Sequence, residues 1–147
     1  MRPGWTAYPQ DALSALGTTR SNSVFRARIF SHQGRKKRRV GWAGKAIGSG
    51  HDVQLIYIGL ASAELARMRV AQRVAAGGHT VPAEKVASRY PRSRENLAKA
   101  MEFVPAVFLF DNSTHAEYRR LGIFEDGRLV EKTGKAIPQW AQRFFAQ

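Results

Sequence analysis

A row of arginines beside a flexible break is the part of this sequence best suited to chemistry. Gly77 and Gly78 let the chain turn freely, and Pro82 favours the start of a new helix just beyond them. The cations follow as Arg89, Arg92 and Arg94. Guanidinium groups neutralise the charge that develops on a phosphoryl group during its transfer. A hinge, a helix start and a row of cations together predict a lid that closes over phosphate.

Two strands are expected to position this lid, one on each side of it in the sequence. Residues 53–60 are almost continuously apolar and rich in β-branched side chains, which suits a buried strand, and residues 106–110 have the same character. Between them, one helix is predicted from the N-cap Ser62 to the paired glycines. Residues 82–103 continue with helical spacing, in which Pro91 predicts a break or a kink.

The rest of the chain predicts further elements around this unit. Residues 24–30 suit an edge strand, and residues 35–47 have helical spacing. The turn residues 125–127 between apolar runs predict a β-hairpin, residues 137–145 predict an amphipathic helix, and residues 1–22 are poorly patterned. This order indicates an α/β fold with an open, mostly parallel sheet, flanking helices and a C-terminal β-hairpin.

The lid segment and its surroundings resemble a known enzyme family. Gly-Gly-His-Thr-Val-Pro at residues 77–82, Arg-Tyr-Pro-Arg-Ser at residues 89–93 and Phe-Asp-Asn-Ser at residues 110–113 are similar to the second half of the zeta-toxin-like P-loop kinases. The resemblance covers residues 23–147 and implies a partial P-loop kinase-like fold. It also implies phosphorylation of a small hydroxylated substrate such as a UDP-amino sugar, with ATP and Mg²⁺ as cofactors.

The resemblance assigns catalytic roles to the arginines that match the family's lid. These residues are Arg73, Arg89 and Arg92. Many relatives have two adjacent arginines before the tyrosine, whereas this chain has Ser88 before Arg89, so one cation is lost. The alternative is an exposed helix whose arginines are simply solvated.

Two further pairs of residues match positions of the family's ligand sites. Asn112 and Ser113 follow the second strand, where the resemblance places the adenine, and are candidates for cofactor binding. An ordinary turn explains the same residues equally well. Ser31 and His32 follow a phenylalanine as in the family's substrate-placing element and are candidates for substrate binding, with a surface turn as the alternative.

The sequence also departs from the family at positions that matter for catalysis. A phosphate loop needs two glycines with four residues between them, followed by lysine and a hydroxyl residue. Gly44 and Lys45 come nearest, but Ala46 follows them and Arg39 occupies the earlier glycine position. Ala27 replaces the glutamate of the substrate-placing element. We therefore expect a truncated kinase domain whose activity is weak or absent.

Composition sets the remaining expectations. The 147 residues include no cysteine, and the four histidines are not spaced like metal ligands, so we predict no metal site. The formal net charge of +13 attracts anions in general. No window is apolar over the length of a membrane span, so we expect a cytoplasmic protein with no membrane partner.

Charge also supports competing hypotheses. The basic block at residues 35–39 suits nonspecific contacts with phosphates, so a non-catalytic α/β module that binds nucleic acid or another polyanion is the alternative function. Such charge runs are more often solvated surfaces. The family resemblance leaves an antitoxin protein open as a partner, besides the nucleotide and the small substrate. A third hypothesis is a gene remnant without a stable product.

Overall fold

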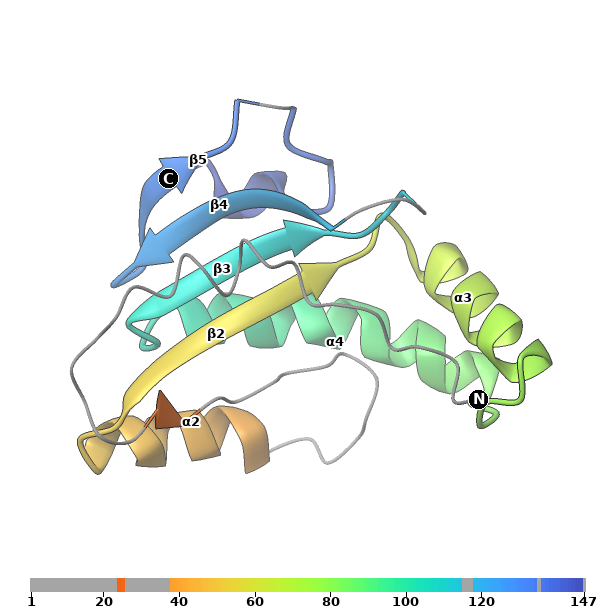
Figure 1. The fold of residues 1–147 in the computed structure, drawn as a ribbon, viewed down its shortest axis with the longest axis horizontal. Coiled ribbons are helices and arrows are strands. Elements are labelled where there is room, and N and C mark those ends of the chain that lie inside the picture. The colour runs from red at the N-terminus through yellow and green to blue at the C-terminus, as the bar shows by residue number, and fades with distance from the viewer. Residues whose placement is uncertain (1–23, 26–37, 115–117, 135, 147) are drawn as a thin grey trace.

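The fold alternates helices and strands in the manner of an α/β protein, which confirms the predicted class (Figure 1). The computed structural model describes residues 24–25, 38–114, 118–134 and 136–146. The strands are β1 (Val24–Phe25), β2 (Asp52–Gly59), β3 (Ala106–Asp111), β4 (Arg119–Glu125) and β5 (Arg128–Lys132). The helices are α2 (Arg38–Gly48), α3 (Ala63–Ala75) and α4 (Ala83–Met101), with a short 3₁₀ helix, η1 (Gln142–Phe144), near the end.

The sheet is mixed rather than mostly parallel. Its strand order is β1-β2-β3-β4-β5, in which β2 runs parallel to β1 and β3, while the β3–β4 and β4–β5 pairs are antiparallel. The expected mostly parallel sheet is therefore not confirmed. The physical reason is the short link between β3 and β4, since a parallel pair needs a crossover of about a dozen residues or more.

The two central strands end side by side. In the parallel β2–β3 ladder, Gly59 is paired with Asp111, the last residue of each strand. Both strands were predicted from their apolar runs and are confirmed. The crossover from the carboxyl end of β2 to the start of β3 carries α3 and α4, so the predicted lid is part of this crossover.

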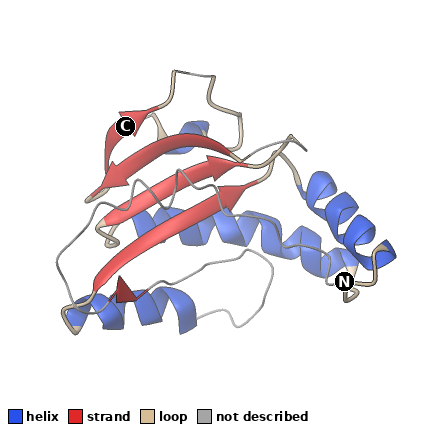
Figure 2. Ribbon diagram, viewed as in Figure 1, coloured by secondary structure: helices blue, strands red, loops and turns tan. Residues whose placement is uncertain are grey.

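One face of the sheet is covered by helices and by the C-terminal segment, which we define as residues 136–146 (Figure 2). The buried side chains on this face form the main core. Leu97 of α4 and Leu109 of β3 are almost completely buried in it, together with Trp140 from the C-terminal segment. This core joins elements that are far apart in the sequence and makes the sheet and its covering helices one unit.

A pair of helices projects beyond the carboxyl ends of β2 and β3 (Figure 1). We call α3 and the first half of α4, residues 63–93, the helical hairpin. Ser62 caps α3 by accepting a hydrogen bond from the Leu65 N–H, as predicted. Gly77 follows the end of α3 at φ +85°, a conformation that favours glycine, and confirms the predicted stop. The hairpin has its own small core of Ala66, Val70 and Val86.

The predicted C-terminal β-hairpin is also confirmed. Glu125 pairs with Arg128, and the two residues between them, Asp126 and Gly127, both have positive φ. This is the backbone of a type I′ turn, which the Asp-Gly pair favours.

Two predicted helical features are wrong. Of the break or kink predicted at Pro91, the break is wrong, because α4 continues through it from Ala83 to Met101, and the kink stays a prediction. Val86 packs in the hairpin and Leu97 in the main core, so tertiary contacts on both sides of the proline hold the helix together. The helix predicted over residues 137–145 is reduced to η1, since Trp140 turns into the main core instead of following a helical surface.

Several predictions fall partly or wholly outside the described residues. Of the predicted edge strand, only Val24 and Phe25 are described, and they pair with β2 at the edge of the sheet. Of the helix predicted over residues 35–47, the described part begins at Arg38 and includes Gly44, so the nearest match to a phosphate loop is helical. No described helix is long and apolar enough to cross a membrane.

Candidate functional site

The candidate site lies where β2 and β3 end. Ligands of open α/β sheets bind outside the carboxyl ends of the strands, because helix starts and loops present polar groups there. Gly59 and Asp111 mark these ends, and the Asn112 N–H donates a hydrogen bond to the Gly59 carbonyl at 2.9 Å. The two strand ends are therefore fixed to each other one residue beyond the ladder.

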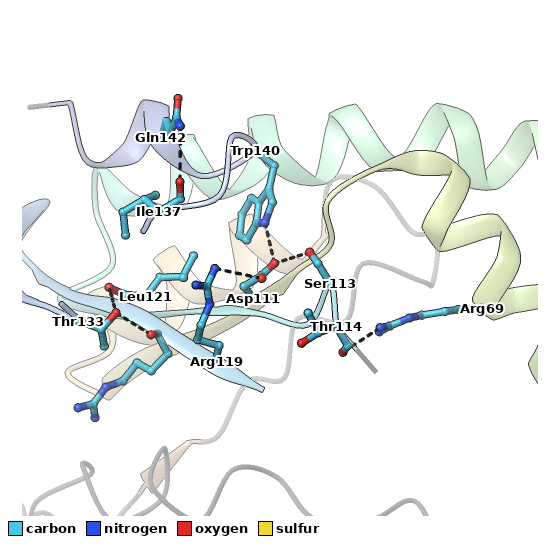
Figure 3. A network of polar contacts seen from close by, with 11 residues as sticks. Arg69, Asp111, Ser113, Thr114, Arg119, Leu121, Thr133, Ile137, Trp140 and Gln142 are labelled. Carbon is cyan, nitrogen blue, oxygen red and sulfur yellow. Dashed lines mark hydrogen bonds and ion pairs between the residues drawn. The ribbon is translucent and has the colours of Figure 1, made fainter. Parts of the chain in front are cut away.

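Asp111 is a buried carboxylate surrounded by hydrogen-bond donors (Figure 3). Its Oδ1 accepts bonds from Ser113 Oγ at 2.5 Å and from Trp140 Nε1 at 2.9 Å. Its Oδ2 lies 3.4 Å from Arg119 Nη2. A buried carboxylate needs such donors, and these three occupy both of its oxygens. Asp111 is therefore suited to holding the site together rather than to accepting a substrate proton.

Trp140 covers the end of β2. A Cβ atom on Gly59 would lie 2.2 Å from Cη2 of the indole ring, so the ring occupies the space that any side chain at residue 59 would need. The indole N–H reaches Asp111 at the end of the neighbouring strand. The missing side chain of Gly59 thus leaves the space in which the Trp140 ring packs on the end of β2.

A small pocket opens between the end of β2 and the helical hairpin. Its volume is about 30 Å³, which is enough for a few water molecules. Apolar side chains from both helices line it, and its polar lining comes from Tyr57, Arg89, Tyr90 and Ser93. The pocket combines a cation with hydroxyl groups on an otherwise apolar wall.

Hydrogen bonds from tyrosines tie the hairpin to β2 around this pocket. Tyr57 and Ser93 share a hydroxyl–hydroxyl bond of 3.0 Å between β2 and α4. The Tyr90 hydroxyl contacts the carbonyls of Leu60 and Ala61 at 2.8 and 2.9 Å, where the chain leaves β2. Burial raises the pKa of both tyrosine hydroxyls above the ordinary value, and the nearby charge of Arg94 opposes that shift. Both phenols are therefore neutral donors or acceptors near neutral pH.

The three predicted catalytic arginines are not gathered at one point. Arg89 lines the pocket. Arg92 folds back along its own helix, where Nε donates to the Ser88 carbonyl at 2.7 Å. Arg73 donates to the His79 carbonyl at 3.3 Å across the turn of the hairpin. Of the three, Arg89 is the one placed beside the strand ends.

The predicted cofactor-binding residues have local roles at the end of β3. The backbone of Asn112 bonds to β2, and Ser113 donates to Asp111. Such contacts are typical of a turn after a strand. The role of these two residues in binding adenine stays a prediction. The predicted substrate-binding residues, Ser31 and His32, lie outside the described residues.

Sequence reasoning missed several residues of the site. Tyr90 and Ser93 belong to the motif that contains Arg89, and the four-residue spacing of Arg89 and Ser93 places them on one helix face, a signal that could have identified the pocket. Asp111 was read as part of a turn. Trp140 could not be recognised from the sequence as part of the site, because its partner Asp111 lies 29 residues away.

The described residues do not fit a Mg²⁺ site of their own. No three acidic, histidine or cysteine side chains among them lie close enough together to hold a metal ion. Asp111, the best placed acid, has both oxygens occupied by donors.

Comparisons of the chain with protein-family models, with curated proteins and with solved structures found no match.

Proposed function

We propose that this chain is the lid-bearing part of a zeta-toxin-like kinase, which binds the phosphates of ATP for transfer to a small hydroxylated substrate such as a UDP-amino sugar. The observation that carries the proposal is the position of the helical hairpin. It crosses from β2 to β3, projects beyond their carboxyl ends and brings Arg89 to a pocket there. This is the edge of the sheet where phosphate ligands bind in open α/β folds.

The pocket supports a contact with phosphate rather than with a base. Arg89 supplies the charge, and the hydroxyl pair of Tyr57 and Ser93 supplies hydrogen bonds. This charge and these hydroxyl groups suit phosphate oxygens, so we place the base of a nucleotide outside the pocket. We place the adenine toward Asn112 and Ser113, at the end of β3.

Arg92 and Arg73 have different routes to the same ligand. The Arg92 guanidinium is bound to its own helix and needs a rotamer change to reach the pocket. Arg73 is bound at the tip of the hairpin and needs movement of the backbone as well. Because Arg89 lines the pocket and the other two lie further from it, we expect Arg89 to contribute most to binding and Arg73 least.

Transfer by this sequence alone is proposed to be weak. It contains no glycine-rich phosphate loop with a lysine, the group that holds the β- and γ-phosphates in P-loop enzymes. Binding is therefore a more informative measurement than turnover.

The test measures the affinity of the full chain for ATP and for inorganic pyrophosphate by calorimetry. Arg89→Gln removes one charge at the pocket, and Arg128→Gln removes one from the exposed start of β5 as a matched control. A charge-assisted hydrogen bond contributes about 1.5–3 kcal/mol, so we expect affinity to fall about 10- to 100-fold in Arg89→Gln. Affinity in Arg128→Gln should change little.

Equal losses in the two variants would refute the site, because they would show that only total charge matters. Phosphate transfer that persists after replacement of all three arginines, Arg73, Arg89 and Arg92, would refute the lid roles and the family assignment.

A second candidate function rests on the net charge of +13. We propose binding of nucleic acid or another polyanion through the basic block at residues 35–39 as the alternative. Retention of DNA or RNA should then decrease steeply with salt and decrease further when the block is neutralised. Retention that is insensitive to salt would exclude this function.

A further inference from the structure

The attachment of the helical hairpin to the sheet combines a small apolar cluster, in which Leu60 after β2 packs against the hairpin core, with several directed polar contacts. The hairpin core of Ala66, Val70 and Val86 forms a cluster separate from the main core. The Tyr90 hydroxyl bonds to the backbone after β2, and Arg69 donates to the Thr114 carbonyl after β3 at 3.3 Å. The angle between the hairpin and the strand ends therefore depends on these polar contacts together with the small apolar cluster and the continuous α4.

Arg94 makes one of these contacts at the point where α4 leaves the sheet. Leu97, three residues later, is in the main core, and Tyr90, one turn earlier, is at the base of the hairpin. Arg94 Nη2 donates to the Trp140 carbonyl at 2.8 Å, and its guanidinium carbon lies 5.9 Å from the centre of the Tyr90 ring. Its Nε is buried and has no hydrogen-bond partner among the described residues. The Trp140 carbonyl and the Tyr90 ring therefore both anchor this side chain.

Trp140 is itself fixed to the ends of both central strands. Its ring fills the space above Gly59, and its N–H donates to Asp111. A continuous series of contacts thus runs from the strand ends through Trp140 and Arg94 to α4, where Arg89, five residues before Arg94, lines the pocket.

We infer that Arg94 and Trp140 are positioning residues, which hold the helical hairpin at the angle that places Arg89 over the pocket. The C-terminal segment acts through them on a site to which it contributes no lining residue among those of the pocket. The inference rests on the proposed function for its ligand, but the position of the hairpin can be measured without one.

The absence of cysteine makes that measurement direct. Met68→Cys on α3 and Val130→Cys on β5 replace exposed side chains and accept nitroxide labels. Double electron–electron resonance then gives the distribution of distances between the hairpin and the sheet. Arg94→Gln removes the contact with the Trp140 carbonyl, and Trp140→Phe removes the N–H donor without any change in charge.

Both variants should broaden or shift the distance distribution of the labelled chain. Affinity for inorganic pyrophosphate should fall about tenfold or more in both, because a displaced Arg89 loses a charge-assisted hydrogen bond to the phosphate that contributes about 1.5–3 kcal/mol. Val53→Ala, which opens a cavity in the main core away from the strand ends, is the control for lost stability. It should leave both readouts unchanged at a temperature where the chain is folded.

Unchanged distances in Arg94→Gln and Trp140→Phe would overturn the inference, even if affinity fell, since Arg94 would then act on the ligand directly. Altered distances in a chain that binds neither pyrophosphate nor ATP would support the positioning role and refute the proposed function. Altered distances in Val53→Ala would also overturn the inference, because they would assign the effect to stability alone.

Discussion

The main core and the helical hairpin are held in different ways. The main core joins large apolar side chains from α4, the sheet and the C-terminal segment, several of them fully buried. The hairpin buries Ala66, Val70 and Val86, all smaller side chains. Since stabilisation by burial grows with apolar area, the sheet is a firm frame and the hairpin a lightly packed attachment. Lightly packed regions open at lower free energy than the frame that carries them, as a lid requires.

The largest expected effect compares two positions on one helix. Leu97→Ala creates a cavity in the main core and should lower the free energy of unfolding by about 2–5 kcal/mol. Val86→Ala removes fewer buried atoms from the hairpin and should cost about 1–2 kcal/mol. Urea denaturation measures both losses.

Hydrogen exchange then shows which helices and strands lose protection in each variant. Val86→Ala should increase exchange in α3 and in the first turns of α4 while β2 and β3 stay protected. Uniform loss of protection in Val86→Ala would contradict the division into frame and attachment.

The next effect tests the junction between the two regions. Gly59→Ala places a methyl group where the Trp140 ring lies, and overpacking of this kind costs about 1–3 kcal/mol. Gly44→Ala, in the exposed part of α2 with no atom near the added Cβ, should instead stabilise the chain by about 0.5–1 kcal/mol. Thermal denaturation separates the two, and Gly59→Ala should also change the fluorescence of Trp140 in a chain whose other tryptophans are replaced by phenylalanine. Equal stability of the two variants would show that Trp140 is not closely packed on β2.

Much of the frame could be predicted from sequence because its signals are local. The apolar runs of β2 and β3, the cap at Ser62 and the Asp-Gly turn before β5 each depend on neighbouring residues. The antiparallel pairing of β4 with β3 was not predicted, because the apolar pattern of a strand does not show in which direction it runs beside its neighbour. The continuity of α4 at Pro91 was missed because contacts with two separate cores outweigh the local effect of proline.

The candidate site was predictable only in part. Arg89 was singled out through its motif and lines the pocket at the end of β2, and its catalytic role stays a prediction. Asp111 and Trp140 meet across 29 positions of the chain, and Arg94 meets Trp140 across 46. Contacts over such separations depend on the fold and leave no periodic signal in the sequence.

A smaller effect is expected at the start of the hairpin. Ser62→Ala removes the acceptor that caps α3 and should cost about 0.5–2 kcal/mol. Ser62→Asn retains a capping acceptor and should be close to the original. Hydrogen exchange of the first turn of α3 checks both, and a loss in Ser62→Asn as large as that in Ser62→Ala would show that the cap is not responsible.

The smallest effect concerns pH and the bond that joins frame and hairpin. Burial raises the pKa of Tyr57 above its ordinary value of 10.0, so the folded state holds this proton at pH values where the unfolded state has released it. The free energy of unfolding is therefore unaffected by this group below about pH 10 and decreases as pH rises above it. Tyr57→Phe should show a shallower alkaline decrease, whereas Tyr118→Phe, at an exposed position, should keep the original slope. Chemical denaturation at a series of pH values from about 8 to about 11 gives these slopes, and identical slopes in all three chains would show that the Tyr57 proton does not contribute.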